Sequence, residues 1–235
     1  MFEAKDINYT YPDGKFSIKN FQVTLDSNKV IGIVGRNGAG KTTMLNILTG
    51  FIRDFDGALL YNHQSFKRKN FIDLISYLPS DFELYEYLSL LDNLVFVCKL
   101  RKIDADQDYL KKKLSEIGLL DRANSKLQTL SVGMKQKFFF LVATLHHPKI
   151  LVLDEPFTGL DPEQTVKYIF KLKKFVKNGG SIIFSSHILD FVSEISDSVL
   201  VIDDGKILQS VEKKNGTKEE LREGLDLFFK SFSDE

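Results

Sequence analysis

The sequence has little of several features that mark particular classes of protein. Only one of its 235 residues is cysteine, Cys98, which excludes an intrachain disulfide framework and indicates a reducing compartment. Neither charge is in excess, because Lys and Arg together number 32 and Asp and Glu also number 32. The chain therefore lacks the net basic field that nucleic-acid binding usually requires, and we expect no nucleic-acid partner.

Long hydrophobic runs are also missing. The longest apolar run, residues 138–145, is far too short to cross a bilayer, and the first residues carry an acid but no apolar region of a secretory signal. We therefore expect a soluble, cytoplasmic chain that acts at a membrane only through a partner. Its 235 residues are enough to bury a full core as one α/β domain, with or without an inserted lobe.

A glycine-rich loop at residues 35–42 is the strongest motif that is present. It reads Gly-Arg-Asn-Gly-Ala-Gly-Lys-Thr and fits G-x-x-x-x-G-K-[ST] in full, between an apolar run at 30–34 and a helical apolar repeat. Glycines let such a loop turn backbone N–H groups toward phosphate oxygens, while Lys41 adds charge and Thr42 offers a hydroxyl to Mg²⁺. We assign nucleotide binding to Gly35, Arg36, Asn37, Gly38, Ala39, Gly40, Lys41, Thr42 and Thr43.

Two acids, Asp154 and Glu155, follow four apolar residues that read as a strand buried on both faces. They are expected at the carboxyl edge of a parallel sheet, where α/β folds place ligands. Asp154 suits Mg²⁺ binding, and Glu155 can accept the proton of an attacking water. A pair of solvated acids would be an equal interpretation of this dipeptide by itself, but the complete phosphate loop upstream favours the catalytic one.

The remaining patterns divide the chain into three parts. Residues 2–25 alternate as antiparallel strands, residues 81–147 have helical spacing, and strand patterns return after Pro148. Ser131 is placed to cap a helix. The other expected elements are strands at 57–61, 74–78, 150–153, 181–185, 199–202 and 206–211, and helices at 92–100, 106–117, 162–178 and 218–232.

Together the motifs resemble the nucleotide-binding subunit of an ATP-binding cassette (ABC) transporter. Beyond the Walker A loop and Walker B strand, residues 130–134 (Leu-Ser-Val-Gly-Met) are similar to the LSGGQ signature, residues 158–161 to the D-loop, and His187 to the switch histidine. The order and spacing agree along almost the whole chain. The resemblance implies an α/β fold in which a P-loop NTPase, RecA-like core carries an N-terminal antiparallel β-subdomain and an inserted α-helical signature subdomain. The implied division is a core of 1–80 and 148–211, a helical subdomain of 81–147 and a C-terminal extension of 212–235.

This resemblance also implies a head-to-tail dimer, homotypic or heterotypic, that holds two ATP molecules between its subunits. Ser131 and the Gly133 N–H would contact the γ-phosphate held by the other subunit, and Asp161 would bridge the two subunits. Catalysis would rest on Glu155, Lys41 and His187, the last by a hydrogen bond to the γ-phosphate. Among the tyrosines near the first turn, Tyr11 would stack on adenine, with Tyr9 as the alternative.

Three positions depart from the family pattern. Val132 replaces the first signature glycine and Met134 its glutamine, but Ser131 and Gly133 are retained, so we expect the γ-phosphate contact to survive. Ser80 stands where the Q-loop glutamine would reach Mg²⁺ and the attacking water. Serine is too short to do this without an intervening water, and we expect weakened coupling or turnover unless Asp81 or water substitutes.

The implied function is ATP hydrolysis that drives a separate membrane permease, contacted through the helical subdomain and the loop near Ser80 at the inner face of the membrane. The lobe composition and residues 133–136 favour export of a drug, peptide or polysaccharide. A soluble ABC ATPase, such as one in iron–sulfur assembly, is the main alternative. The signature and His187 argue against a kinase or GTPase. The presence of both Glu155 and Lys41 argues against a non-hydrolysing regulatory subunit.

Overall fold

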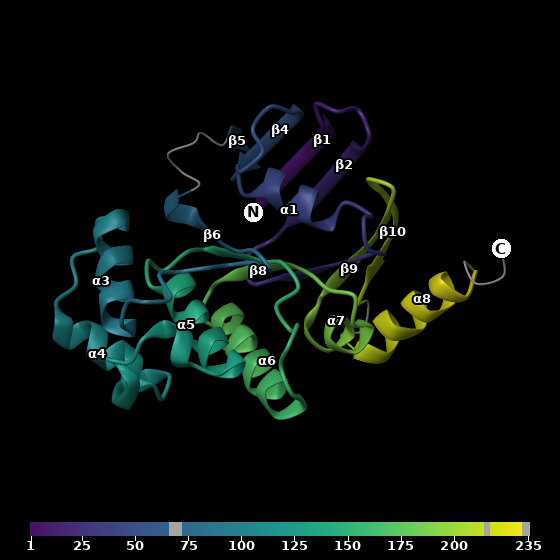
Figure 1. Ribbon diagram of the computed structural model, residues 1–235. Helices are drawn as coiled ribbons and strands as arrows, with labels where there is room; N and C mark the ends of the chain where they lie inside the picture. The colour runs from purple at the N-terminus through teal and green to yellow at the C-terminus, as the bar shows by residue number, and fades with distance from the viewer. Residues whose placement is uncertain (66–71, 214–216, 232–235) are drawn as a thin grey trace. The chain divides into compact units, whose positions relative to one another are not determined.

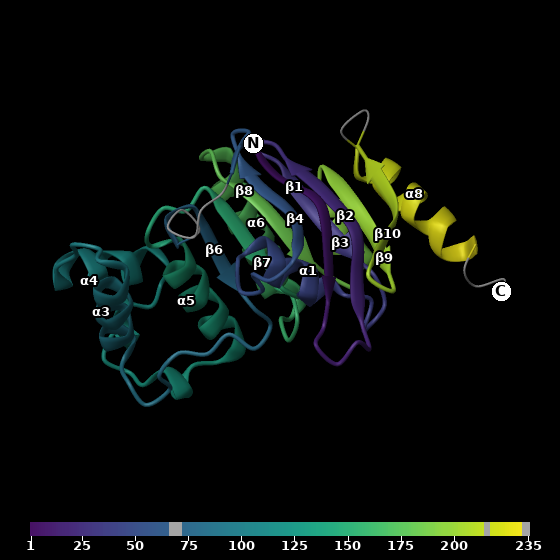
Figure 2. The same ribbon diagram turned by 90° about the horizontal axis from the view of Figure 1, so that it is seen from above.

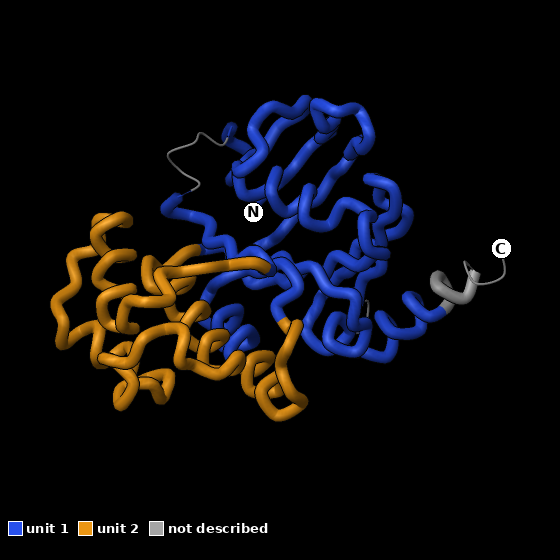
Figure 3. Tube along the Cα trace, viewed as in Figure 1, with its two compact units in different colours: residues 1–80, 149–156, 171–235 blue, residues 81–148, 157–170 orange. Residues whose placement is uncertain are grey.

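The structure is a computed structural model that describes residues 1–65, 72–213 and 217–231. It divides into two compact units, coloured separately in Figure 3. Unit 1 contains residues 1–80, 149–156 and 171–235, and unit 2 contains residues 81–148 and 157–170. No helix among the residues that the structure describes is long and apolar enough to cross a bilayer.

The N-terminal part of unit 1 is an antiparallel sheet with the strand order β2-β1-β4-β5 (Figure 1). Its strands are β1 (Phe2–Thr10), β2 (Ser17–Leu25), β4 (Asp56–Tyr61) and β5 (Gln64–Ser65). In the second half of β2, alternate residues are buried, namely Phe21, Val23 and Leu25, as expected for a sheet with one face on the core. The antiparallel pairing predicted for residues 2–25 is thereby confirmed.

The larger sheet of unit 1 has six strands in the order β10-β9-β3-β8-β7-β6. All neighbours are parallel except β10, which pairs antiparallel with β9. Strands β3, β7 and β8 are buried along their whole length, as expected for apolar runs without alternation, and β8 carries a serine at each end. The six strands are β3 (Val30–Val34), β6 (Ile75–Leu78), β7 (Ile150–Leu153), β8 (Ser181–Ser185), β9 (Ser198–Asp203) and β10 (Lys206–Glu212).

Helix α1 (Lys41–Leu48) belongs to one hydrophobic core with both sheets of unit 1. Its Met44, Leu45, Ile47 and Leu48 are completely buried, so this core holds the helix against the sheets. Two further helices, α7 (Leu189–Ile195) and α8 (Lys218–Ser231), pack against each other in the same unit. In Figure 2, α8 lies beside β10.

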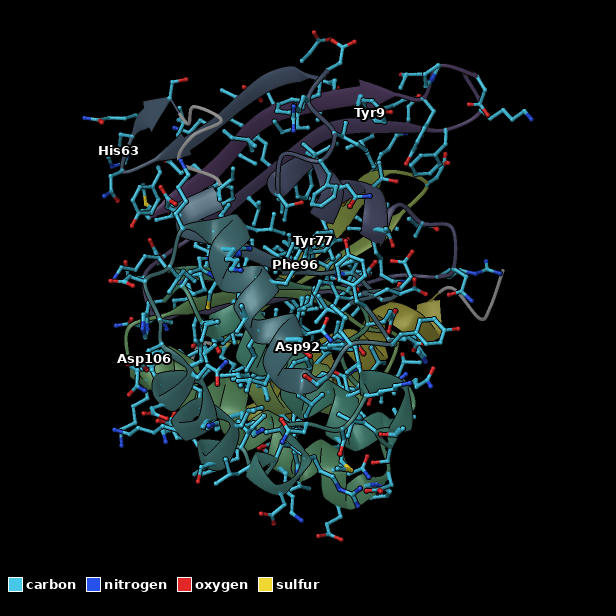
Figure 4. The ribbon with its side chains drawn as sticks, turned by 60° about the vertical axis from the view of Figure 1, so that its left-hand side comes forward. Tyr9, His63, Tyr77, Asp92, Phe96 and Asp106 are labelled. Carbon is cyan, nitrogen blue, oxygen red and sulfur yellow. The ribbon has the colours of Figure 1, made fainter. Side chains whose placement is uncertain are left out.

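Unit 2 is helical, with α3 (Leu90–Arg101), α4 (Gln107–Glu116) and α5 (Val132–Thr144) around a core of leucines and Phe138. Each helix begins at a polar side chain that accepts a backbone N–H: Ser89, Asp106 and, as predicted, Ser131. Short 3₁₀ turns at Leu120–Arg122 and Leu127–Thr129 precede α5. Figure 4 shows Asp92 and Phe96 on α3 and Asp106 at the start of α4.

Helix α6 (Pro162–Lys177) begins in unit 2 and ends in unit 1. Residues 157–170 group with the helical residues 81–148, although the sequence indicates a division at residue 148. The reason is aromatic packing, because the Tyr168 ring lies edge-on to Phe140 at 5.7 Å and to Phe157 at 6.0 Å. Burial in this cluster raises the pKa of Tyr168.

Candidate functional site

The phosphate loop leaves β3 and turns into α1 through two glycines in the left-handed region, Gly38 at φ 84° and Gly40 at φ 103°. A side chain at Gly40 would also place its Cβ 2.7 Å from Cζ of Phe16. At Gly35, a Cβ would come 2.4 Å from the carbonyl oxygen of Ile202. Glycine is therefore required at both ends of the loop, and the loop lies at the N-terminus of α1, where backbone N–H groups and the helix dipole favour an anion.

Lys41 is buried to 7% exposure at the start of α1, although it carries a charge. Its Nζ donates hydrogen bonds to the carbonyl oxygens of Gly35 at 2.9 Å and Arg36 at 3.3 Å. It also lies 3.7 Å from Oε1 of Glu155. A buried ammonium group is tolerated only with such partners, so the loop itself holds the lysine inside the cradle.

Asp154, immediately after β7, is the buried acid of the site, with 3% exposure. Its Oδ2 accepts a hydrogen bond from the Thr42 hydroxyl at 2.7 Å, which joins the phosphate loop to β7. Its Oδ1 accepts one from the hydroxyl of Ser185, the last residue of β8. Both carboxylate oxygens are therefore fixed by side chains from the two elements beside it.

The oxygen donors of Thr42 and Asp154 suit Mg²⁺, which prefers oxygen ligands and usually takes the rest from substrate phosphates and water. Within the described ranges 1–65, 72–213 and 217–231, no group of three or more His, Cys, Asp or Glu side chains could hold a metal ion by itself. The pair therefore fits a cation that arrives with a nucleotide better than a cation held by protein ligands alone.

Glu155 has a backbone φ of 49°, the left-handed region that non-glycine residues rarely adopt. Its Oε2 lies 2.8 Å from Nδ1 of His187 and accepts the His187 backbone N–H at 3.4 Å. The His187 ring is largely exposed, whereas the Glu155 carboxylate is only partly so. The structure thus brings the three predicted catalytic residues of unit 1, Lys41, Glu155 and His187, to one place.

Tyr11 lies near the first turn of α1, where its hydroxyl is 3.2 Å from Oγ1 of Thr43. The Tyr9 ring, labelled on β1 in Figure 4, packs edge-on against it at 5.0 Å. Ser80, by contrast, is exposed two residues beyond β6. Because Leu78 of β6 pairs with Leu153 of β7, Ser80 leaves the sheet from the strand next to the one that carries Asp154.

The predicted signature and D-loop residues lie in unit 2. Ser131 is exposed at the N-cap of α5, and Val132 beside it is also exposed. Gly133 is buried, because a Cβ there would meet the Gln164 side chain at 2.3 Å. Asp161 accepts the Gln164 backbone N–H at 2.7 Å, so it caps the first turn of α6.

Two contacts of the site were not predicted from the sequence. Phe16 fills the space beside Gly40, and Ser185 bonds to Asp154. The only sequence signal for Ser185 is a polar residue at the end of an otherwise apolar strand. That signal does not say which strands lie beside it.

Comparison with known proteins gives the following matches. The sequence model of a family described as ABC transporter matches residues 18–158. The chain is 31% identical to the ABC transporter ATP-binding protein YhaQ of Bacillus subtilis, over 92% of this chain and 76% of that protein. It is 30% identical to the lantibiotic transport ATP-binding protein SrtF of Streptococcus pyogenes, over 95% of each.

Solved structures agree on the fold. The structure of an ATP-binding subunit of an ABC transporter is similar at a TM-score of 0.81 and 24% identity, covering 96% of this chain and 99% of that one. A dimeric ATP-binding cassette bound to ADP and Pi is similar at a TM-score of 0.79 and 22% identity, covering 90% and 98%. The predicted α/β P-loop fold is therefore confirmed.

Proposed function

This chain belongs to the ABC transporter family of ATP-binding proteins, whose members are ATPases, and from that premise we propose that it powers export through a separate membrane permease. The proposed cargo is a drug-, peptide- or polysaccharide-like compound. Two relatives support export, since the name of SrtF states lantibiotic transport and that of LnrL of Bacillus subtilis, 28% identical, states linearmycin resistance. Neither name supports the iron–sulfur alternative.

The observation that carries the proposal is the meeting of the phosphate loop, Asp154 and Glu155 at the carboxyl ends of β3 and β7, on either side of β8. Loop N–H groups and Lys41 bind the phosphates, and Lys41 exchanges its loop carbonyl partners for phosphate oxygens. Thr42 and Asp154 would hold Mg²⁺, which would neutralise negative charge on the nucleotide phosphates.

Glu155 accepts the proton of the attacking water, because its carboxylate is partly open to solvent and lies beside Lys41. Nδ1 of His187 lies against this carboxylate. Once ATP is bound, His187 hydrogen-bonds the γ-phosphate. Tyr11 stacks on adenine.

The site is completed by a second ATPase domain, identical or related, in a head-to-tail dimer. Ser131 and Gly133 of one copy contact the γ-phosphate in the other, and Asp161 bridges the copies. Exposure of Ser131 and Val132 at the N-terminus of α5 supports this role, because a surface that receives a partner's nucleotide must be open. The dimeric cassette of similar fold supports the assembly.

The permease contacts the helical residues 81–147 and the loop near Ser80, which keeps the chain at the inner face of the membrane. Support comes from Tyr85, Tyr87 and Leu88, large hydrophobic side chains that are exposed shortly after Ser80. Ser80 is too short to reach Mg²⁺ without an intervening water, so coupling or turnover is weaker than with a glutamine at this position unless Asp81 or water substitutes.

The test is Glu155→Gln, which keeps the size of the side chain and removes the base. We expect the ATPase kcat to fall about 10²–10⁴-fold and an ATP-bound dimer to elute on gel filtration. Glu116→Gln is the matched control, because Glu116 pairs with Lys113 on the surface of α4. Undiminished hydrolysis by Glu155→Gln, or a persistent monomer in ATP, would contradict the proposed mechanism. Co-expression with a membrane permease that leaves the ATPase rate unchanged would contradict the transport role.

A further inference from the structure

Ser185 is the last residue of β8, the strand that lies between β3 and β7. It pairs with Ile33 of β3, and its neighbour Phe184 pairs with Leu153 of β7. Strand β3 ends at Val34, directly before the phosphate loop, and β7 ends at Leu153, directly before Asp154. Ser185 is completely buried at this point, with 0% exposure.

The Ser185 hydroxyl uses both of its hydrogen-bonding functions on the acidic pair. A serine hydroxyl has one donor and two acceptor lone pairs. The donor goes to Oδ1 of Asp154, and the oxygen accepts the backbone N–H of Glu155 at 2.9 Å. One side chain therefore fixes both the carboxylate of Asp154 and the peptide that joins it to Glu155.

The bond to Asp154 sets how that carboxylate is turned. Oδ2 already accepts the Thr42 hydroxyl, so two bonds from opposite sides leave the buried carboxylate one orientation. Without Ser185, Oδ1 would lose its partner in a buried place, and the carboxylate would be free to rotate away from Thr42. The direction of its lone pairs, and with it the fit to a cation, depends on the serine.

The bond to Glu155 acts on a strained backbone. At φ 49° Glu155 adopts a conformation that persists only where the surroundings over-determine it. Its N–H is held by Ser185, and its carboxylate is held by His187 at 2.8 Å. Removing the first restraint lets the peptide relax, and the carboxylate moves with it.

We propose that Ser185 is a positioning residue of the hydrolysis site, which orients Asp154 toward Mg²⁺ and holds Glu155 in the conformation that aims its carboxylate. The inference rests on the roles proposed above for Asp154 and Glu155. It makes Ser185 a contributor to catalysis that touches neither nucleotide nor water.

The test compares Ser185→Ala with Ser185→Thr, which keeps a hydroxyl, and with Ser185→Cys, which keeps only a weak donor. Ser181→Ala is the matched control. Ser181 lies at the other end of β8, is also buried, donates to the Asp26 carbonyl at 3.0 Å and accepts the Asn28 N–H at 2.9 Å. Ser181→Ala therefore also removes one donated and one accepted hydrogen bond from β8, but at the end of the strand away from the site.

Three quantities are measured for each variant in the full chain: kcat with KM for ATP, the Mn²⁺ affinity of the ATP complex by EPR, and ATP affinity in EDTA. We expect Ser185→Ala to lose about 10- to 100-fold in kcat and in Mn²⁺ affinity, with ATP affinity in EDTA within twofold of the native protein. Ser185→Thr should recover most of the loss, and Ser181→Ala should show none.

Equal kcat and Mn²⁺ affinity for Ser185→Ala and Ser181→Ala would overturn the inference. So would equal losses in all three Ser185 variants, because Ser185→Thr keeps the hydroxyl. Should Ser185→Ala not fold, the ranking of Ser185→Cys below Ser185→Thr in Mn²⁺ affinity carries the same test. Failure of the proposed site is distinguishable, because Glu155→Gln would then retain hydrolysis whatever Ser185 does.

Discussion

The phosphate loop offers a substitution whose cost can be worked out from the structure, Gly40→Ala. An alanine at φ 103° is strained by about 1–3 kcal/mol. Its Cβ would also lie 2.7 Å from Cζ of Phe16, and overpacking of this kind costs about 1–3 kcal/mol. We expect a total loss of about 2–6 kcal/mol, a large part of the 5–15 kcal/mol that stabilises a typical domain.

Gly38→Ala separates the two contributions. Gly38 also has a left-handed φ, 84°, but a Cβ there meets nothing within 4 Å. This variant should lose only the strain, about 1–3 kcal/mol. Phe16→Leu removes the far end of the ring, which a Cβ at position 40 would meet. Its loss of unfolding free energy should therefore be smaller in the Gly40→Ala background than in the native protein, with a coupling between the two substitutions of about 0.5–3 kcal/mol.

The assay is urea unfolding of the native protein, the three single variants and the double variant. Circular dichroism reports the free energy of unfolding. Equal losses for Gly40→Ala and Gly38→Ala, or independent effects of Gly40→Ala and Phe16→Leu, would refute the reasoning that Phe16 occupies the space a Cβ needs.

Two further predictions concern the adenine-binding tyrosine and an ion pair on the surface of unit 1. Tyr11→Ala should weaken ATP binding by about 1–3 kcal/mol, the value of a base stacked on an aromatic ring. Tyr11→Phe keeps the ring and loses only the 3.2 Å contact with Thr43, so its ATP affinity should lie within a few fold of that of the native protein. Fluorescent ATP titration measures both, and a larger loss for Tyr9→Ala than for Tyr11→Ala would reverse the assignment. The hydrogen bond from Lys173 lowers the pKa of Glu194, so its contribution is present above the ordinary pKa of 4.5 and lost as pH falls through the folded value. Lys173→Met should therefore cost about 1 kcal/mol or less at pH 7, and this cost should shrink as pH falls below 4.5. An equal cost at pH 7 and pH 3 in urea unfolding would show that the ion pair is not the cause.

Most elements of the fold could be predicted because their signals are local. The apolar runs of β3, β7 and β8 and the cap of α5 at Ser131 are found within a residue or two of their expected places. Helix α7 was not predicted, since its seven residues are too few for a clear helical period. The place of residues 157–170 in unit 2 depends on aromatic packing around Tyr168, which no periodicity records.

The sequence by itself determined the phosphate loop, the acidic pair and the family, because these depend on residue types at short, fixed spacings. Only the tertiary structure decided what each side chain bonds to. Thr42 meets Asp154 across 112 residues, Ser185 meets it across 31, and His187 meets Glu155 across 32. These contacts exist because β8 lies between β3 and β7, and strand order is set by how the sheet packs rather than by any local pattern.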